Sequence, residues 1–312
     1  MDFVIFVVAM ATLIWGADVL VQESEKIAMH FNISDFIIGA TLIALGTSLP
    51  EMAASIIASI NNKPQIAIAN VIGSNILNIT MVLGTIFIIT KKSMSPDRDF
   101  FAKDSYWAIV PIFVFILIAF DGVISRFDSI ILLILMAAYI LFLIREAKGI
   151  VEEQVDDDID KSKFRWYYTL PLIFVSIISV VVGANFTVDS ASNIAKSFGI
   201  SEWVIGMIMI SVGTSLPELA VSITASIRGK VDMAIGNIIG SNMANTTIVL
   251  GFAGLAQPLH IDIFNHIFDI LTMLIATFML VFLTANKLYN KPAGISLYVI
   301  LFIFLEHTLA TI

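Results

Sequence analysis

The sequence predicts an all-α polytopic membrane protein whose ten transmembrane helices form two inverted five-helix repeats. Three observations carry this prediction. Charged residues make up 13% of the 312 residues, against roughly 25% in soluble globular proteins, while 58% are hydrophobic and the mean hydropathy is +0.95. Apolar stretches long enough to cross a bilayer follow one another along nearly the whole chain. The second half of the sequence also repeats the first.

The composition excludes several classes of protein. So little charge cannot cover a soluble protein of this size, which argues against a cytosolic enzyme. A net charge of −8 and a pI near 4.9 disfavour a nucleic-acid partner, because phosphate backbones attract basic surfaces. The chain has no cysteine, which excludes disulfides, thiolate metal ligands and thiol catalysis.

Ten apolar stretches of about 20 residues predict the spans. They cover 2–22, 34–60, 65–90, 105–121, 124–144, 167–189, 202–227, 231–256, 265–285 and 293–311. The first stretch follows Met1 and Asp2 without a basic segment or a small-residue cleavage pattern. We therefore expect it to be retained as a helix rather than removed as a signal peptide.

The distribution of Lys and Arg predicts the orientation, because cytoplasmic loops retain positive charge. With the N-terminus outside, 14 of the 17 basic residues lie on the inner side, and only Lys63, Arg126 and Lys196 lie outside. We expect a multi-pass protein of the cell membrane with both termini outside. The one long hydrophilic stretch, 146–165, is then an acidic cytoplasmic linker, and it lacks the glycine and final glutamate of an EF-hand loop.

The chain contains an internal duplication. Residues 35–84 align with 202–251 at an offset of 167 without a gap, and 28 of the 50 pairs are identical. The offset passes five spans, an odd number, so the copies cross the membrane in opposite directions. This predicts a first repeat at 1–145 and a second at 166–312. Inverted repeats with interrupted helices are typical of secondary transporters that bind their substrate near the bilayer midplane.

Each copy carries the segment Gly-Thr-Ser-Leu-Pro-Glu near the middle of a span, at 46–51 and at 213–218. A proline inside a helix removes a hydrogen-bond donor and clashes with the preceding turn. We therefore expect a break in each helix and free carbonyl oxygens around Ala44 to Gly46 and Ser211 to Gly213. The hydroxyls of the segment lie three and four residues before its glutamate, so they share one helix face with the carboxylate.

The next span of each copy carries a polar stripe with a spacing of four residues. The stripe consists of Asn70, Ser74 and Asn78 in the first copy, and of Asn237, Ser241 and Asn245 in the second. The glycine before each serine, Gly73 in the first copy, predicts a close approach between this helix and the broken one.

Glu51 and Glu218 are the acidic residues that this segmentation places near the bilayer centre. A charge there costs on the order of 2.5–3.5 kcal/mol on insertion scales, so such a residue indicates function. The surrounding groups are carboxylate, hydroxyl, amide and carbonyl oxygens, with no Cys or His nearby. These hard ligands suit Ca²⁺, and also Na⁺, which is nearly the same size; they suit zinc, copper and iron poorly.

At these residues the chain closely resembles the cation/calcium antiporter superfamily, in particular the sodium/calcium exchangers of prokaryotic size. The resemblance rests on the paired Gly-Thr-Ser-Leu-Pro-Glu and Gly-Ser-Asn-x-x-Asn segments and on about 100 residues of repeat core. It implies four ion sites at the midplane between broken helices. The positions that match the family's ion ligands are Ala44, Thr47, Ser48, Glu51, Ser74, Asn78, Ser211, Thr214, Ser215, Glu218, Ser241 and Asn245.

The resemblance implies an antiporter that exchanges Na⁺ for Ca²⁺ by alternating access, with no cofactor, no enzymatic activity and a functional monomer in the lipid. Some members, including potassium-dependent exchangers, carry Asp where this chain has Asn245, so we expect independence from K⁺. Gradient energetics favour about three Na⁺ per Ca²⁺. The alternatives are an antiporter that exchanges H⁺ for Ca²⁺ or another divalent cation, and, more remotely, a calcium-permeable channel.

Overall fold

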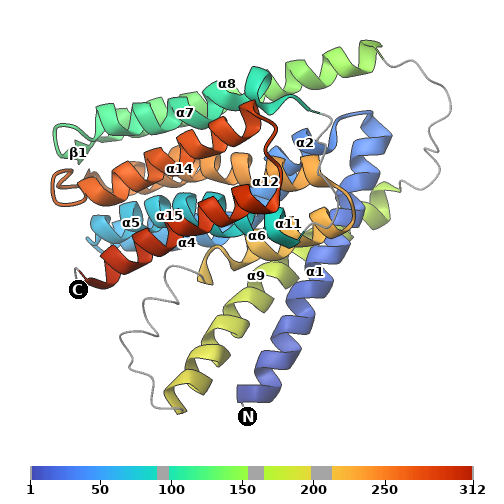
Figure 1. The fold of residues 1–312 in the computed structure, drawn as a ribbon, viewed down its shortest axis with the longest axis horizontal. Helices are drawn as coiled ribbons and strands as arrows, with labels where there is room; N and C mark the ends of the chain where they lie inside the picture. The colour runs from blue at the N-terminus through green and yellow to red at the C-terminus, as the bar shows by residue number, and fades with distance from the viewer. Residues whose placement is uncertain (1, 90–97, 154–164, 198–212, 311–312) are drawn as a thin grey trace. The chain divides into compact units, whose positions relative to one another are not determined.

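The computed structural model describes residues 2–89, 98–153, 165–197 and 213–310 (Figure 1). Their contacts divide the chain into two compact units. Unit 1 consists of Met1–Pro50 and Phe142–Asn237, and unit 2 consists of Glu51–Leu141 and Ile238–Ile312. Each unit takes residues from both predicted repeats. The division at 1–145, 146–165 and 166–312 therefore stays a prediction drawn from sequence similarity.

Unit 1 is built around two long helices, α1 (Asp2–Phe31) and α9 (Trp166–Ser197), which lie side by side (Figure 1). Its other elements are α2 (Asp35–Ile38), the π-helical segment η1 (Gly39–Ile43), α3 (Ala44–Thr47), α11 (Leu216–Ile227) and the first part of α12 (Val231–Ala244).

The helices α1 and α9 approach each other at two glycines that are 167 residues apart. A Cβ atom on Gly183 would lie 2.7 Å from the backbone nitrogen of Leu13, and one on Gly16 would lie 2.9 Å from Cβ of Ser179. Both positions therefore need a residue without a side chain, as is common where membrane helices pack closely.

The first helix is longer than the apolar stretch 2–22 predicts. It continues to Phe31 through a polar segment whose charged side chains form ion pairs. The ammonium of Lys230, in the turn after α11, lies 2.6 Å from the carboxylate of Glu25. The helix ends where Asn32 takes a left-handed conformation with φ of 52°.

Unit 2 contains the remaining elements. They are α4 (Leu49–Ile60, from Glu51 on), α5 (Pro64–Leu77), η2 (Asn78–Leu83), α6 (Gly84–Ile89), α7 (Phe100–Ile118), β1 (Val123–Ile124), α8 (Arg126–Glu153, up to Leu141), the end of α12, η4 (Asn245–Val249), α13 (Leu250–Ala256), β2 (Leu259–His260), α14 (Ile267–Ala285) and α15 (Lys291–Ala310). The two short strands pair antiparallel and join the α7–α8 and α13–α14 connections. Its core packs residues of α5, α7, α13 and α14, such as Val71, Phe115, Leu250 and Ile270.

The described residues contain eight helices long and apolar enough to cross a membrane, or nine if the bent pair at 35–60 is one span. They fall on nine of the predicted spans. The remaining span, predicted at 202–227, is described only from residue 213 on, where α11 is a shorter apolar helix. The all-helical membrane fold is confirmed, and the count of ten stays a prediction.

Candidate ion-binding site

A turn occurs at the point of the predicted helix break in both copies, although the residues before the turn of the second copy are described only from 213 on. Between α3 and α4 the chain bends by 45° at Ser48, whose φ and ψ are −83° and 5°. Its equivalent, Ser215, precedes α11 with a φ of −87° and a ψ of 2°. In both copies the proline two residues later lacks an N–H group, so the helical hydrogen-bond pattern cannot continue through the turn. Each glutamate then lies in the first turn of the following helix.

Glu218 is a buried carboxylate in unit 1 with few partners. The Ser48 hydroxyl, from the other repeat, donates a hydrogen bond of 3.3 Å to its Oε1. Its Oε2 has no hydrogen-bond partner within the described part of the chain. By contrast, buried Asp104 in unit 2 forms a bidentate ion pair with Arg98. The Nε and Nη2 atoms of Arg98 donate to the two carboxylate oxygens at 2.6 and 2.9 Å. A buried charge needs such a partner, and none of the ion pairs found among the described residues supplies one to Glu218.

Further oxygen atoms of unit 1 surround the same turn. The Thr47 hydroxyl lies 3.3 Å from Oδ1 of Asn237, whose amide nitrogen donates to the Ser222 hydroxyl at 2.9 Å. Ser215 is buried, and its hydroxyl has no partner among the residues described. Thr214 lies in the turn and is partly buried.

The expectation of free carbonyls is wrong for Ala44. Its oxygen accepts the Ser48 N–H at 3.0 Å and lies 3.3 Å from the Thr47 hydroxyl. The helix therefore continues through this residue, and the missing donor is that of Pro50, two positions after the turn. Ser211, the equivalent of Ala44, lies outside the described residues.

Unit 2 repeats part of this arrangement around Glu51, which is fully buried in the first turn of α4. The side-chain nitrogen of Asn70 donates to the Glu51 carbonyl at 3.3 Å and to the Ser55 hydroxyl at 3.0 Å. The bond from Asn70 to Ser55 is the counterpart of that from Asn237 to Ser222. The duplication therefore preserves a buried side-chain contact as well as the sequence.

The residues of the polar stripe are buried. Ser74 and Ser241 are at most 2% exposed. Asn78 and Asn245 are fully buried, and each begins a π-helical segment, η2 or η4. Such π-helical turns often occur at functional sites. The side-chain oxygen of each asparagine has no hydrogen-bond partner among the described residues. These oxygens can therefore act as ligands without losing an existing bond.

The prediction for Gly73 is wrong. Apart from its chain neighbours and the adjacent turns of its own helix, no atom of the described residues lies within 4 Å of a Cβ built on it. Close helix approach occurs instead at Gly39 and Gly236, where a Cβ atom would meet the carbonyl oxygens of Met233 and Phe36. The broken span and α12 therefore pack tightly at these glycines, and α1 and α9 do so at Gly16 and Gly183.

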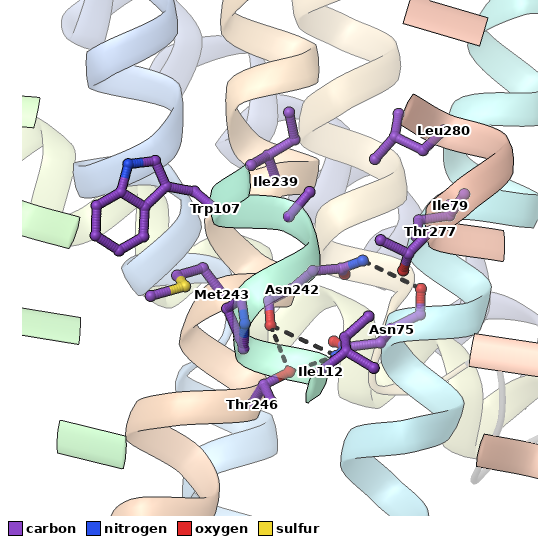
Figure 2. Close-up of a pocket in the computed structure, with 12 residues that line it drawn as sticks. Asn75, Ile79, Trp107, Ile112, Ile239, Asn242, Met243, Thr246, Thr277 and Leu280 are labelled. Atoms are coloured by element: carbon purple, nitrogen blue, oxygen red, sulfur yellow. Dashed lines mark hydrogen bonds between the residues drawn. The ribbon is translucent and has the colours of Figure 1, made fainter. Parts of the chain in front are cut away.

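The prediction also missed residues that hold the site. The hydroxyls of Ser55 and Ser222 accept hydrogen bonds from the side-chain amides of Asn70 and Asn237. Asn242 accepts a hydrogen bond from Asn78, and Asn75 accepts one from Asn245. Both acceptors line a small cavity of unit 2 with Thr246 (Figure 2). The serines and the asparagines are identical in the two copies and lie in apolar helices, a signal that could have identified them.

The chemistry of both units is that of a hard cation site. The described residues contain no cluster of three or more His, Cys, Asp or Glu side chains. The polar groups are instead carboxylate, hydroxyl and amide oxygens, which suit Ca²⁺ and Na⁺ better than softer transition metals.

Comparisons with known proteins agree with this chemistry. A family model described as sodium/calcium exchanger protein matches residues 1–145 and 168–309. The uncharacterized membrane protein MJ0091 of Methanocaldococcus jannaschii is 40% identical over 240 residues, 77% of each chain. The sodium/calcium exchanger MaX1 of Methanosarcina acetivorans is 29% identical, and the match covers 95% of both chains. A solved structure of the sodium-calcium exchanger NCX_Mj, soaked with Na⁺ and Sr²⁺, matches with a TM-score of 0.82 at 34% identity, covering 98% of this chain and 97% of that one.

Proposed function

The chain belongs to the sodium/calcium exchanger protein family, and on that basis we propose that it exchanges Na⁺ for Ca²⁺ by alternating access, with Glu51 and Glu218 as the central ligands. It is a membrane transporter of the cation/calcium antiporter superfamily and not an enzyme. Na⁺ and Ca²⁺ are its substrates, and no cofactor takes part.

The observation that carries the proposal is the state of Glu218. Its carboxylate is buried, and one oxygen accepts a hydrogen bond from the Ser48 hydroxyl while the other has no hydrogen-bond partner among the described residues. Leaving such a group ionised without a partner is costly, and a bound cation removes that cost. Two carboxylates, from Glu51 and Glu218, would neutralise one Ca²⁺.

The remaining ligands follow from the oxygen inventory and the family's motif. Thr47 and Thr214 complete the Ca²⁺ shell, while the asparagines line the centre. Sodium ions occupy flanking sites and compete for the same carboxylates, so the two substrates exclude each other. The flanking ligands and central asparagines are Ser48, Ser74, Asn78, Ser211, Ser215, Ser241 and Asn245.

Energetics support about three Na⁺ per Ca²⁺ for calcium extrusion. A tenfold Na⁺ gradient supplies about 1.4 kcal/mol per ion, and a 10⁴-fold Ca²⁺ gradient requires about 5.5 kcal/mol. Two Na⁺ supply about 2.8 kcal/mol, and voltage adds nothing because the exchange is electroneutral. Three supply about 4.1 kcal/mol, and the net charge adds about 2.3 kcal/mol at 100 mV. Only the electrogenic exchange is sufficient.

The orientation of the chain is part of the proposal. We place both termini outside the cell membrane and the linker 146–165 in the cytoplasm, from the positions of Lys and Arg. Because the chain has no cysteine, single cysteines can be introduced at exposed Lys63 and Lys287. An impermeant maleimide added to intact cells should label the first and not the second. Labelling of position 287 and not of position 63 would show that the chain has the opposite orientation in the membrane.

The decisive experiment is uptake of ⁴⁵Ca²⁺ into vesicles that contain the purified full chain. Vesicles are loaded with Na⁺, with K⁺, or with an acidic buffer free of Na⁺. We expect uptake only from Na⁺ loading, accompanied by a net outward positive current. When the Na⁺ gradient is reversed and drives Ca²⁺ out of the vesicles, the net positive current should be inward. Uptake driven by acidic loading would establish H⁺ exchange instead. Uptake without any counter-ion would establish a channel.

A further inference from the structure

A pair of asparagines next to the candidate site forms a reciprocal network in unit 2. The side-chain nitrogen of Asn242 donates to the carbonyl of Asn75 at 3.3 Å, and that of Asn75 lies 3.5 Å from the carbonyl of Asn242. Asn75 also donates to the Thr246 hydroxyl at 2.8 Å (Figure 2). The hydroxyl in turn donates to the Asn242 carbonyl at 3.0 Å. Asn75 and Asn242 are equivalent positions of the two repeats.

The donor and acceptor ends of both asparagine side chains are fixed, because their partners in this network include backbone carbonyls. A carbonyl oxygen only accepts, so each amide must turn its nitrogen toward the carbonyl of the other residue. The side-chain oxygen of Asn242 therefore points the other way and accepts the amide nitrogen of Asn78 at 3.0 Å. The oxygen of Asn75 accepts the amide nitrogen of Asn245 at 3.2 Å in the same manner.

This direction decides which end of Asn78 and Asn245 remains available. Their nitrogens are engaged, and their oxygens are buried without a hydrogen-bond partner in the described part of the chain. An amide has an acceptor end and a donor end of almost the same shape, and only the oxygen can bind a cation. A turn of 180° would present the NH₂ group and repel the ion.

We propose that Asn75 and Asn242 are positioning residues that hold the amide oxygens of Asn245 and Asn78 toward the transported ion. This rests on the proposed function, because it takes Asn78 and Asn245 as ion ligands. The two residues do not ligate the ion themselves. They remove the alternative amide orientation before an ion arrives, so the site is organised when empty.

The two halves of the network are not equally strong. The equivalent of Thr246 in the first copy is Ile79, which has no hydroxyl. Asn75 therefore donates to a side-chain hydroxyl as well as a carbonyl, and Asn242 has no equivalent hydroxyl. The orientation of Asn245, which depends on Asn75, should be held more firmly than that of Asn78.

A double-mutant cycle tests the proposal by Ca²⁺ binding to the purified full chain, measured with ⁴⁵Ca²⁺ so that turnover is not required. Asn242→Leu keeps the approximate shape but removes the acceptor, and should raise the half-saturating Ca²⁺ concentration about tenfold, the size of one lost buried hydrogen bond. In an Asn78→Ala background the same change should have less than about a twofold effect, because the oriented group is already absent.

The matched control combines two residues that do not share a hydrogen bond, Asn242 and Asn245. The effects of Asn242→Leu and Asn245→Ala on the half-saturating Ca²⁺ concentration should be nearly multiplicative in the double variant. Ser59→Ala removes another buried hydrogen bond of unit 2, that to the Ala253 carbonyl at 2.7 Å, and should change the melting temperature but not Ca²⁺ binding. Equal, multiplicative effects in both asparagine pairs would overturn the proposal and leave Asn242 with a structural role alone.

A milder pair of variants tests the proposal if Asn242→Leu does not fold. Thr246→Val removes the hydroxyl that accepts from Asn75, while Thr246→Ser retains it. The valine variant should raise the half-saturating Ca²⁺ concentration roughly threefold, and the serine variant should leave it unchanged. The two variants behaving alike would contradict the proposal.

Failure of Na⁺-driven uptake by the unmodified chain, with these binding results intact, would overturn the exchange function but not the positioning role.

Discussion

The Ser48 hydroxyl lies 3.3 Å from Oε1 of Glu218, 170 residues further along the chain. The hydroxyl comes from the break in the first copy and the carboxylate from the helix after the break in the second. A carboxylate of one repeat that we propose as an ion ligand therefore accepts a hydrogen bond from the other repeat. Changes on either side of this bond should alter the same binding event.

Ser48→Ala should weaken Ca²⁺ binding without abolishing exchange. A hydrogen bond to a charged group contributes about 1.5–3 kcal/mol, and this long bond should contribute near the lower limit, about tenfold in the half-saturating Ca²⁺ concentration. The measurement is ⁴⁵Ca²⁺ uptake over a range of Ca²⁺ concentrations. Ser48→Thr retains the hydroxyl and serves as the control. An unchanged concentration dependence for the alanine variant would remove Ser48 from the site.

Glu51→Gln and Glu218→Gln should each abolish Ca²⁺ transport while the protein stays folded. Each change keeps the shape of the side chain and removes half of the charge that faces a divalent ion. The melting temperature without Ca²⁺ should not fall, because a buried carboxylate is replaced by a neutral side chain of the same shape. Ca²⁺ should no longer raise the melting temperature of the variants, whereas it stabilises the unmodified chain. Normal uptake by either variant would show that its carboxylate is not a ligand.

Exchange should be independent of K⁺. Asn245 is neutral, so the centre lacks the additional carboxylate that would balance a co-transported monovalent ion. Replacing K⁺ with choline on both sides of the vesicle membrane should leave Na⁺-driven uptake unchanged. Asn245→Asp supplies the missing charge and should make transport sensitive to K⁺ or to pH. A strong K⁺ requirement in the unmodified chain would contradict this interpretation of Asn245.

Gly183→Ala should destabilise the contact between α1 and α9. Its Cβ atom would lie 2.7 Å from a backbone nitrogen, and backbone atoms cannot move aside as a flexible side chain can. Overpacking of this kind typically costs about 1–3 kcal/mol. Gly73→Ala is the matched control, because a Cβ atom there meets nothing within 4 Å among the described residues apart from its chain neighbours and the adjacent turns of its own helix. Thermal unfolding in detergent should separate the two, and an equal response would refute the close contact.

Alkaline pH should weaken the attachment of α1 to the turn after α11. Burial lowers the pKa of the Lys230 ammonium, but its hydrogen bond to Glu25 and the charges of Asp35 and Glu25 raise it more, so the net pKa lies above the ordinary value of 10.5. The stabilisation is complete below that ordinary value and is lost as the pH rises through the higher folded-state pKa.

The measurement for this prediction is the melting temperature between about pH 9 and pH 12. Lys230→Met should lower the melting temperature at pH 9 and flatten its fall above the ordinary lysine pKa. A parallel fall in both proteins would show that other groups govern the alkaline transition.

Much of the fold could be predicted because its signals lie along the chain. Apolar length identified the spans, and the offset of 167 identified equivalent residues before their contacts were known. The buried state of Glu51 and Glu218 followed from their place in those spans. The length of α1 could not be predicted in this way, because its polar end depends on Lys230, which lies in the second copy.

The order of amino acids alone establishes which atoms are available: two carboxylates, a set of hydroxyls and amides, and a proline that interrupts each broken helix. How these atoms are turned depends on the folded chain. The sequence places an asparagine at position 78 but does not say which way its amide group is turned. In the folded chain its nitrogen donates a hydrogen bond to the side-chain oxygen of Asn242, from the other repeat, and this bond fixes the orientation that we propose. Hydrogen-bond direction depends on the partner, and residues 164 positions apart become partners only when the chain has folded.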